Sequence, residues 1–184
     1  MRRSLTAALA IALTAAVVSA PTASASIGPG TSFTPDSVWV HMRPTLDSAH
    51  ATINKGPNIA AMCWYYDGQQ FWDLIVDYAN NIVGYTLESY LTTAAYQSCM
   101  SLGHNHRFVT DVWVHFQPRG NTVDYEALTM ATSTDIAAAC TVPNIQDPSD
   151  GNSIRTWYVV VDHGSNVAGF TWASSVAGPV PPPC

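Results

Sequence analysis

An internal repeat constrains this chain more than any other feature, because a duplicated sequence encodes one structural unit twice. Four blocks of the first half recur in the same order in the second half. They are Val38–His41 with Val112–His115, Ile59–Cys63 with Ile136–Cys140, Trp72–Asp77 with Trp157–Asp162, and Gly84–Thr86 with Gly169–Thr171. Equivalent residues are separated by 74, 77, 85 and 85 residues, so the spacing changes only between blocks. Insertions in surface loops produce this pattern. The sequence therefore predicts two copies of one module.

The blocks also define the boundaries of the modules. We expect the first module at 37–99 and the second at 111–184, with a linker at 100–110. A lead-in rich in Pro, Gly, Ser and Thr precedes them at 26–36, and we expect it to be flexible.

Each repeated block is typical of a short β-strand. Residues 38–42 and 72–76 are rich in β-branched and aromatic side chains. Asp67-Gly68 and Asn80-Asn81 are turn sequences, and no segment has a sustained, capped helical period. Several short strands separated by turns predict an all-β fold, with a small barrel or sandwich for each module.

The four cysteines follow the repeat, since Cys63 is equivalent to Cys140 and Cys99 to Cys184. Four cysteines allow three pairings. Copies of one module should contain the same bridge, so we predict Cys63–Cys99 and Cys140–Cys184. The alternatives are that the modules exchange partners or that one thiol stays free. A module of about 65 residues has a marginal core, which such a bridge strengthens by about 3–4 kcal/mol.

The residues of each module resemble bacterial Src-homology-3-like domains, which open on a strand like L-N-V-R-x-G-P and close on G-(W/Y)-V-x-x-x-Y-L. The first copy carries this resemblance at 38–44, Lys55-Gly56, Trp72 and 84–91, and the second at 112–118, Trp157 and 169–176. His41 and His115 stand where the family has Arg, and the cysteine pair is not a family-wide feature. The resemblance implies two tandem small SH3-like β-barrels. It also implies a role in binding peptidoglycan or its peptides.

The first 25 residues have the pattern of a secretory signal peptide. Two arginines are followed by an apolar run over 5–20 and by Ala23-Ser24-Ala25, a signal-peptidase motif. We place the cleavage before Ser26; the alternative is an uncleaved anchor. Cleavage predicts a secreted protein that either stays in the medium or associates with the cell wall. We expect it to have no membrane contact and to lie in a compartment where disulfides persist.

The charge of the chain excludes one class of partner. The net charge is −6, and it becomes about −8 once Arg2 and Arg3 are removed, with Lys55 the single lysine. Binding of nucleic acid needs a basic face, so we expect no nucleic-acid partner.

No pattern predicts catalysis or a cofactor. There is no G-x-S-x-G motif, and the cysteines are better explained as bridges. Asp73, Asp77 and Asp162 are the acid–base candidates, but the last two precede turns and are expected to cap them. His104-Asn105-His106 offers two imidazoles without an evident third ligand, so we expect no metal site. His41 and His115 recur in the repeat and are expected to be structural.

Binding is therefore the predicted function, with aromatic side chains as its carriers. Trp72 and Trp157 are expected in the core. Neighbouring residues of a strand face opposite ways, so part of the Trp64-Tyr65-Tyr66 run should be exposed. The predicted ligand-binding residues are Trp64, Tyr65, Tyr66, Asp67, Tyr85, Tyr90, Tyr158 and Trp172. The expected partner is peptidoglycan or its peptides; the alternative is a secreted protein, for which this chain is an inhibitor or accessory factor.

Overall fold

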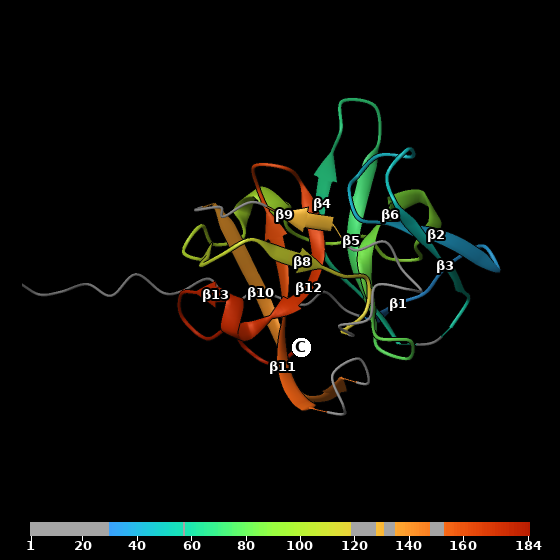
Figure 1. Ribbon diagram of the computed structural model, residues 1–184. Coiled ribbons are helices and arrows are strands. Elements are labelled where there is room, and N and C mark those ends of the chain that lie inside the picture. Colours follow the sequence, from blue (N-terminus) through green and yellow to red (C-terminus); the bar gives the residue numbers. More distant parts are fainter. Residues whose placement is uncertain (1–29, 57, 119–127, 131–134, 148–152) are drawn as a thin grey trace, which may run out of the picture.

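The computed structural model describes residues 30–56, 58–118, 128–130, 135–147 and 153–184 (Figure 1). These residues form strands and short 3-10 helices, with no α-helix among them, so the predicted all-β class is confirmed. The signal peptide predicted at 1–25 lies outside the described residues. Within the described part, no helix has both the length and the apolar character needed to cross a bilayer.

The first copy forms one six-stranded antiparallel sheet in the order β1-β4-β5-β6-β2-β3. Its strands are β1 (Gly30–Thr31), β2 (Ser37–His41), β3 (His50–Asn54), β4 (Ile59–Tyr66), β5 (Phe71–Asp77) and β6 (Ile82–Leu87). Two 3-10 helices follow, η1 (Glu88–Tyr90) and η2 (Cys99–Ser101). The predicted turns are present between β4 and β5 and between β5 and β6.

The second copy repeats this order of strands but divides them among three sheets. Its main sheet has the order β10-β11-β12, and β8–β9 and β13–β7 form two further pairs. The strands are β7 (Arg107–Phe108), β8 (Val112–Val114), β9 (Leu128–Met130), β10 (Ile136–Asp147), β11 (Ser153–Asp162), β12 (Val167–Trp172) and β13 (Val176–Ala177), and the 3-10 helix η4 (Ala173–Ser175) precedes β13. The sheets of both copies are open.

The register of the strands repeats between the copies. Trp72 pairs with Leu87 across β5 and β6, and the equivalent Trp157 pairs with Trp172 across β11 and β12. The register also shifts immediately before Cys63 in β4 and before Cys140 in β10. A bulge of this kind re-aims the side chains that follow it. In both copies, therefore, the first cysteine lies at the same place in the strand, directly after a register shift.

Both predicted disulfides are confirmed. Cys63 is bonded to Cys99 and Cys140 to Cys184, with Cα–Cα distances of 4.8 and 4.9 Å. Each bridge ties the first strand of the copy's longest hairpin, β4 or β10, to the segment that ends the copy.

The described part of the lead-in, from Gly30 on, and the linker both pack onto the copies that follow them. Phe33 and Phe108 are both completely buried. Phe33 pairs with Leu91, and Phe108 pairs with Val176 at the equivalent place in the second copy. The described parts of these two segments therefore include the short first strand of each copy, β1 or β7, with Phe33 in an isolated bridge after β1. These short strands cannot be predicted from the sequence, because two residues are too few to show the alternation of a strand.

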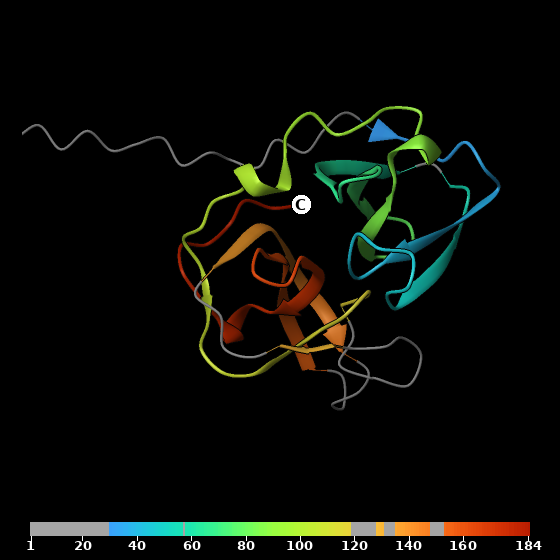
Figure 2. The same cartoon turned by 90° about the horizontal axis from the view of Figure 1, so that it is seen from above.

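The copies pack against each other in a reciprocal way (Figures 1 and 2). The Val83 amide donates to the Phe116 carbonyl at 2.9 Å, and the equivalent Ala168 amide donates to the Met42 carbonyl at 3.0 Å. Both hydrophobic clusters of the molecule contain residues from both copies. The copies therefore resemble the subunits of a two-fold symmetric dimer joined in one chain.

Candidate functional site

Each copy has a groove beside the strand that opens it. The first groove has a volume of about 430 Å³ and is lined by Pro35, Ser37, Val38, Trp39, His41, Leu46, Trp72, Leu87 and Tyr90. The second groove has a volume of about 160 Å³ and is lined by Thr110, Asp111, Val112, Trp113, His115, Thr171, Trp172 and Ser175. Most of these positions are equivalent under the repeat. We therefore take the two grooves as the candidate site.

An exposed tryptophan stands in each groove because of strand alternation. Val38 and Val40 of β2 point into the core, so Trp39 between them faces outward and is 53% exposed. In β8, Trp113 is 52% exposed between two buried valines. Neither tryptophan is among the binding residues predicted from the sequence. The alternation in the repeated V-W-V block carried the signal.

The histidine that follows each tryptophan forms the floor of the groove. His41 and His115 are buried, as expected of repeated structural positions. His41 meets Trp72 edge-on with ring centroids 5.4 Å apart, and His115 meets Trp157 in the same way at 5.8 Å. Burial lowers the pKa of His41, and the neighbouring His50 lowers it further. The floor of the first groove is therefore uncharged at neutral pH.

The walls of the two grooves differ. Beside the first groove, the His50 ring lies 4.5 Å from the Trp39 ring, tilted by 30°, and the predicted Tyr90 is an exposed lining residue. In the second groove the predicted Trp172 is half-buried, and the guanidinium of Arg155 lies 4.2 Å from its ring centroid. This contact is a cation–π interaction. Equivalent positions thus present different chemistry in the two copies.

A third hollow lies between the copies and contains two of the predicted residues. It has a volume of about 540 Å³ and is lined by Arg43, Pro44, Thr45, Leu46, Asp47, Tyr65, Asp67, Gln69, Gln70, Ser165 and Asn166. Tyr65 accepts a hydrogen bond from the Asn166 amide at 3.0 Å. Leu46 lines both this hollow and the first groove. The predicted residues are therefore divided among neighbouring hollows instead of forming one site.

Asp67 has a structural role in this arrangement. One of its oxygens accepts from the amides of Gln69 and Gln70, at 2.7 and 2.8 Å. The other accepts from the indole nitrogen of Trp72 at 2.8 Å. The hydrogen bonds from Gln70 and Trp72 hold the pKa of this carboxyl below its usual value. Asp67 caps its turn and anchors the core tryptophan.

The Trp64-Tyr65-Tyr66 run is partly exposed, as predicted. Trp64 is half-buried and meets Phe71 edge-on at 5.6 Å, while Tyr66 is exposed and lies 4.8 Å from the same ring. The Tyr66 hydroxyl donates to the Gly68 carbonyl at 3.0 Å. These rings form an aromatic surface outside the grooves.

Two predicted binding residues belong to the core and are corrected here. Tyr85 is completely buried, and Tyr158 is only 8% exposed. Burial raises the pKa of the Tyr85 phenol, and its hydroxyl has no hydrogen-bond partner. Each tyrosine stands on a central strand whose side chains are covered on both faces, so neither reaches a ligand at the surface.

The candidate acid–base residues lie at turns or in the core. Asp77 accepts from the Ala79 amide at 2.9 Å, and Asp162 accepts from the Gly164 amide at 2.9 Å, so both cap turns as predicted. Asp73 is fully buried and accepts from the Ala95 amide at 2.8 Å. Burial raises its pKa to about 6. It lines none of the three hollows described above.

The two linker histidines separate. His106 is buried and its Nε2 lies 2.8 Å from the Pro179 carbonyl oxygen, whereas the side chain of His104 is half exposed. They do not act as a pair of ligands.

Comparisons of the chain with protein-family models, with curated proteins and with solved structures found no match.

Proposed function

We propose that this protein is a secreted, non-catalytic binding protein of the cell wall, built from two tandem SH3-like modules. Its ligand would be peptidoglycan or its peptides. The observation that carries the proposal is that equivalent grooves in the two copies each present an exposed tryptophan, Trp39 and Trp113. Large exposed aromatic side chains in an apolar, polar-rimmed groove are typical of binding sites.

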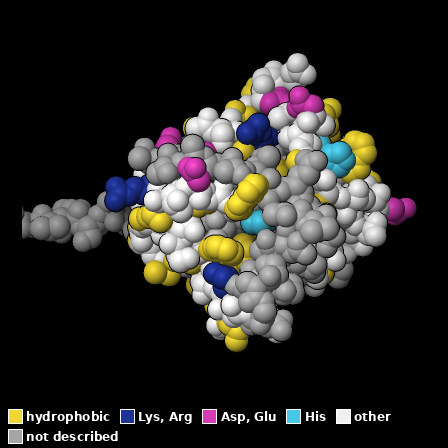
Figure 3. Space-filling model, in the orientation of Figure 1, with side chains coloured by type: hydrophobic (Ala, Val, Ile, Leu, Met, Phe, Trp, Pro, Cys, Tyr) yellow, Lys and Arg dark blue, Asp and Glu magenta, His cyan; other side chains and the backbone are white. Residues whose placement is uncertain are grey.

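The chemistry of the first groove suits an uncharged, partly apolar ligand. Trp39 offers a flat face, and His41 is held neutral by burial. Flat aromatic faces stack on the apolar faces of sugars and grip peptide side chains. Figure 3 shows exposed hydrophobic side chains in several groups, two of them next to a histidine, while Lys and Arg are sparse on this face.

Two grooves in one chain support retention on a polymer. A wall polymer presents the same unit many times. Because the copies are packed together, binding at one groove holds the other at high local concentration. Two weak contacts then combine into a longer residence time.

The extracellular location is part of the proposal. Two disulfides are compatible with an oxidising compartment. The signal-peptide pattern at 1–25 and the acidic charge of the chain agree with export.

A secreted protein partner is the second candidate. It is favoured by the unlike walls of the grooves, since Tyr90 lines the first groove and Trp172 lines the second. Arg155 stacks on the Trp172 ring, whereas His50 lies against Trp39. Unlike walls suit an asymmetric partner, such as an enzyme that this chain inhibits or assists.

The test is co-sedimentation with purified peptidoglycan sacculi, using the parent protein, Trp39→Ala, Trp113→Ala and the double variant. We expect each single variant to weaken pelleting and the double variant to abolish it. Tyr96→Ala is the matched control, because Tyr96 is an exposed aromatic residue that lines neither groove. A parent protein that stays in the supernatant contradicts wall binding. A stoichiometric complex in culture supernatant, lost in the double variant, would establish the protein partner instead.

A further inference from the structure

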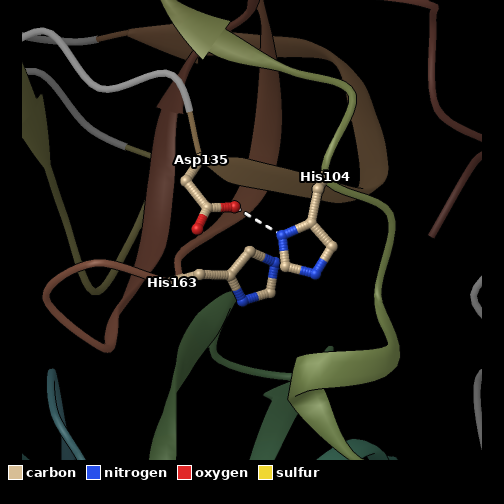
Figure 4. A group of neighbouring side chains, drawn as sticks. All are labelled: His104, Asp135 and His163. Carbon is tan, nitrogen blue, oxygen red and sulfur yellow. Dashed lines mark hydrogen bonds and ion pairs between the residues drawn. The ribbon is translucent and has the colours of Figure 1, made fainter.

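Three potential metal ligands lie close together at the open end of the β10–β11 hairpin, opposite its turn (Figure 4). His104 lies in the loop after η2, Asp135 immediately before β10, and His163 immediately after β11. One ligand atom from each residue lies within 4.8 Å of the other two. The His163 amide donates to the Asp135 carbonyl at 3.0 Å, so the hairpin itself brings these two together.

His163 is the most informative member of the cluster. It is only 7% exposed, and neither of its ring nitrogens has a hydrogen-bond partner. The Gly103 backbone also faces the ring, outside hydrogen-bonding geometry. A buried polar atom without a partner is costly. Figure 4 shows one ring nitrogen directed toward His104.

His104 and Asp135 complete the cluster from the solvent side. Their side chains are about half exposed, and His104 Nδ1 is hydrogen-bonded to Asp135 Oδ1. The rings of His104 and His163 stack with centroids 4.1 Å apart. The cluster thus has one buried imidazole, that of His163, and two groups that an ion reaches from solvent.

The first copy shows that the fold does not require these side chains. The positions equivalent to Asp135 and His163 are Asn58 and Tyr78. The Tyr78 amide donates to the Asn58 carbonyl at 3.0 Å, the same backbone hydrogen bond as in the second copy. The ligating residue types are therefore a feature of the second copy alone, on a backbone that both copies share.

We propose that His104, Asp135 and His163 form a binding site for a divalent transition-metal ion, with zinc as the best fit. Two imidazoles and one carboxylate are donors that zinc prefers, whereas calcium and magnesium need oxygen ligands. Zinc–ligand distances are about 2.0–2.2 Å, so tetrahedral ligand atoms lie about 3.4 Å apart. The ligand atoms of the cluster lie within 4.8 Å of one another, and rotation of the half-exposed His104 and Asp135 side chains brings them to the distance that zinc needs. Three protein ligands leave one coordination position for water or another ligand.

The site would cross-link the loop after η2 to the β10–β11 hairpin. This loop leads from the first copy into the second, so an ion here fixes the junction of the two copies. An ion that binds only the native state stabilises it by mass action.

The test is calorimetric titration of ZnCl2 into metal-free protein with both disulfides formed and no histidine tag. We expect one ion per chain and a rise of the thermal unfolding midpoint with zinc. The variants are His104→Ala, Asp135→Asn and His163→Tyr. The last two introduce the residues that the first copy has on the same backbone, so they preserve folding. Each should weaken zinc binding by about tenfold or more.

His50→Ala is the matched control, since His50 is an exposed histidine outside the cluster, and it should bind zinc as the parent does. MgCl2 should give no binding. Two results would overturn the proposal: no zinc binding by the parent protein, or equal binding by the parent and the three cluster variants.

Discussion

Gly84 and Gly169 occupy equivalent positions, and each lies directly against the strand that opens its own copy. A Cβ added at Gly84 would lie 2.7 Å from the His41 carbonyl oxygen, and one at Gly169 would lie 2.6 Å from that of His115. Such separations are far below van der Waals contact. A side chain at either glycine would push β6 or β12 away from the backbone on which the groove stands.

We therefore expect Gly84→Ala and Gly169→Ala each to lower the free energy of unfolding by about 1–3 kcal/mol, since overpacking against backbone forces strands apart. Denaturant unfolding measures the change. Gly30→Ala is the matched control, because a Cβ there would meet no atom within 4 Å. This control also corrects for the entropy of the unfolded chain, which is smaller with alanine than with glycine. Glycine variants as stable as this control would contradict the close approach.

The shared clusters predict that the two copies unfold together. Residues of both copies contribute to each hydrophobic cluster, and the amides of Val83 and Ala168 cross between the copies. We expect a single cooperative transition for the intact protein. Replacing either cysteine pair by alanine should lower the stability of the whole molecule.

The two bridges should contribute similarly to that stability. They span 36 and 44 residues, and loop entropy depends only weakly on length, so each loss should cost about 4 kcal/mol. Calorimetry of the intact protein and of both double variants tests this. Two separate transitions, with one unchanged when the other copy loses its bridge, would show instead that the copies fold independently.

The sequence predicts the parts of this fold that local pattern determines. The repeat, the turn aspartates and the two disulfides are all readable because they depend on equivalence or on a few neighbouring residues. The pairings of Phe33 and Phe108 cannot be predicted in this way, since each residue is ordered by pairing with a distant part of the chain and by burial. The same limit explains Tyr85, whose burial depends on what covers its strand.

The candidate sites show this limit more clearly. The outward position of Trp39 follows from alternation within five residues of chain. The proximity of Asp135 to His163 depends instead on the register of a long hairpin, and that of His104 on the path of the loop after η2. Tertiary placement of this kind has no signature in spacing along the sequence.

The raised pKa of the Asp73 carboxyl predicts that the stability of the protein decreases as the pH rises. Burial raises the pKa of this carboxyl to about 6 in the folded state, from 3.8. Between these two values the unfolded chain has lost the proton and the folded protein retains it. Stability is therefore highest below about pH 4 with respect to this group, and it falls as the pH rises toward 6, by up to about 3 kcal/mol.

The variant Asp73→Asn should remove this slope while keeping an acceptor for the Ala95 amide. The measurement is the free energy of unfolding at several pH values between 4 and 7. Asp111→Asn, at an exposed aspartate, is the control and should retain the slope of the parent. An unchanged slope in Asp73→Asn would show that another group is responsible.

The two core tryptophans offer a measurement of one buried hydrogen bond. Trp72 and Trp157 are equivalent and both completely buried, yet only Trp72 donates its indole hydrogen to a carboxylate, that of Asp67. The indole nitrogen of Trp157 has no partner. Trp72→Phe and Trp157→Phe leave similar cavities, so the difference between their effects compares a paired buried indole with an unpaired one.

We expect Trp72→Phe to cost about 1.5–3 kcal/mol more than Trp157→Phe, the range for a hydrogen bond to a charged group. The difference should nearly vanish in an Asp67→Ala background, where neither tryptophan has a charged acceptor. Denaturant unfolding of these six proteins, the parent and Asp67→Ala included, gives the comparison. Equal losses of unfolding free energy for the two tryptophan variants in the parent background would contradict this role of Asp67. The hydrogen bond from Trp72 to Asp67 would then contribute nothing to stability.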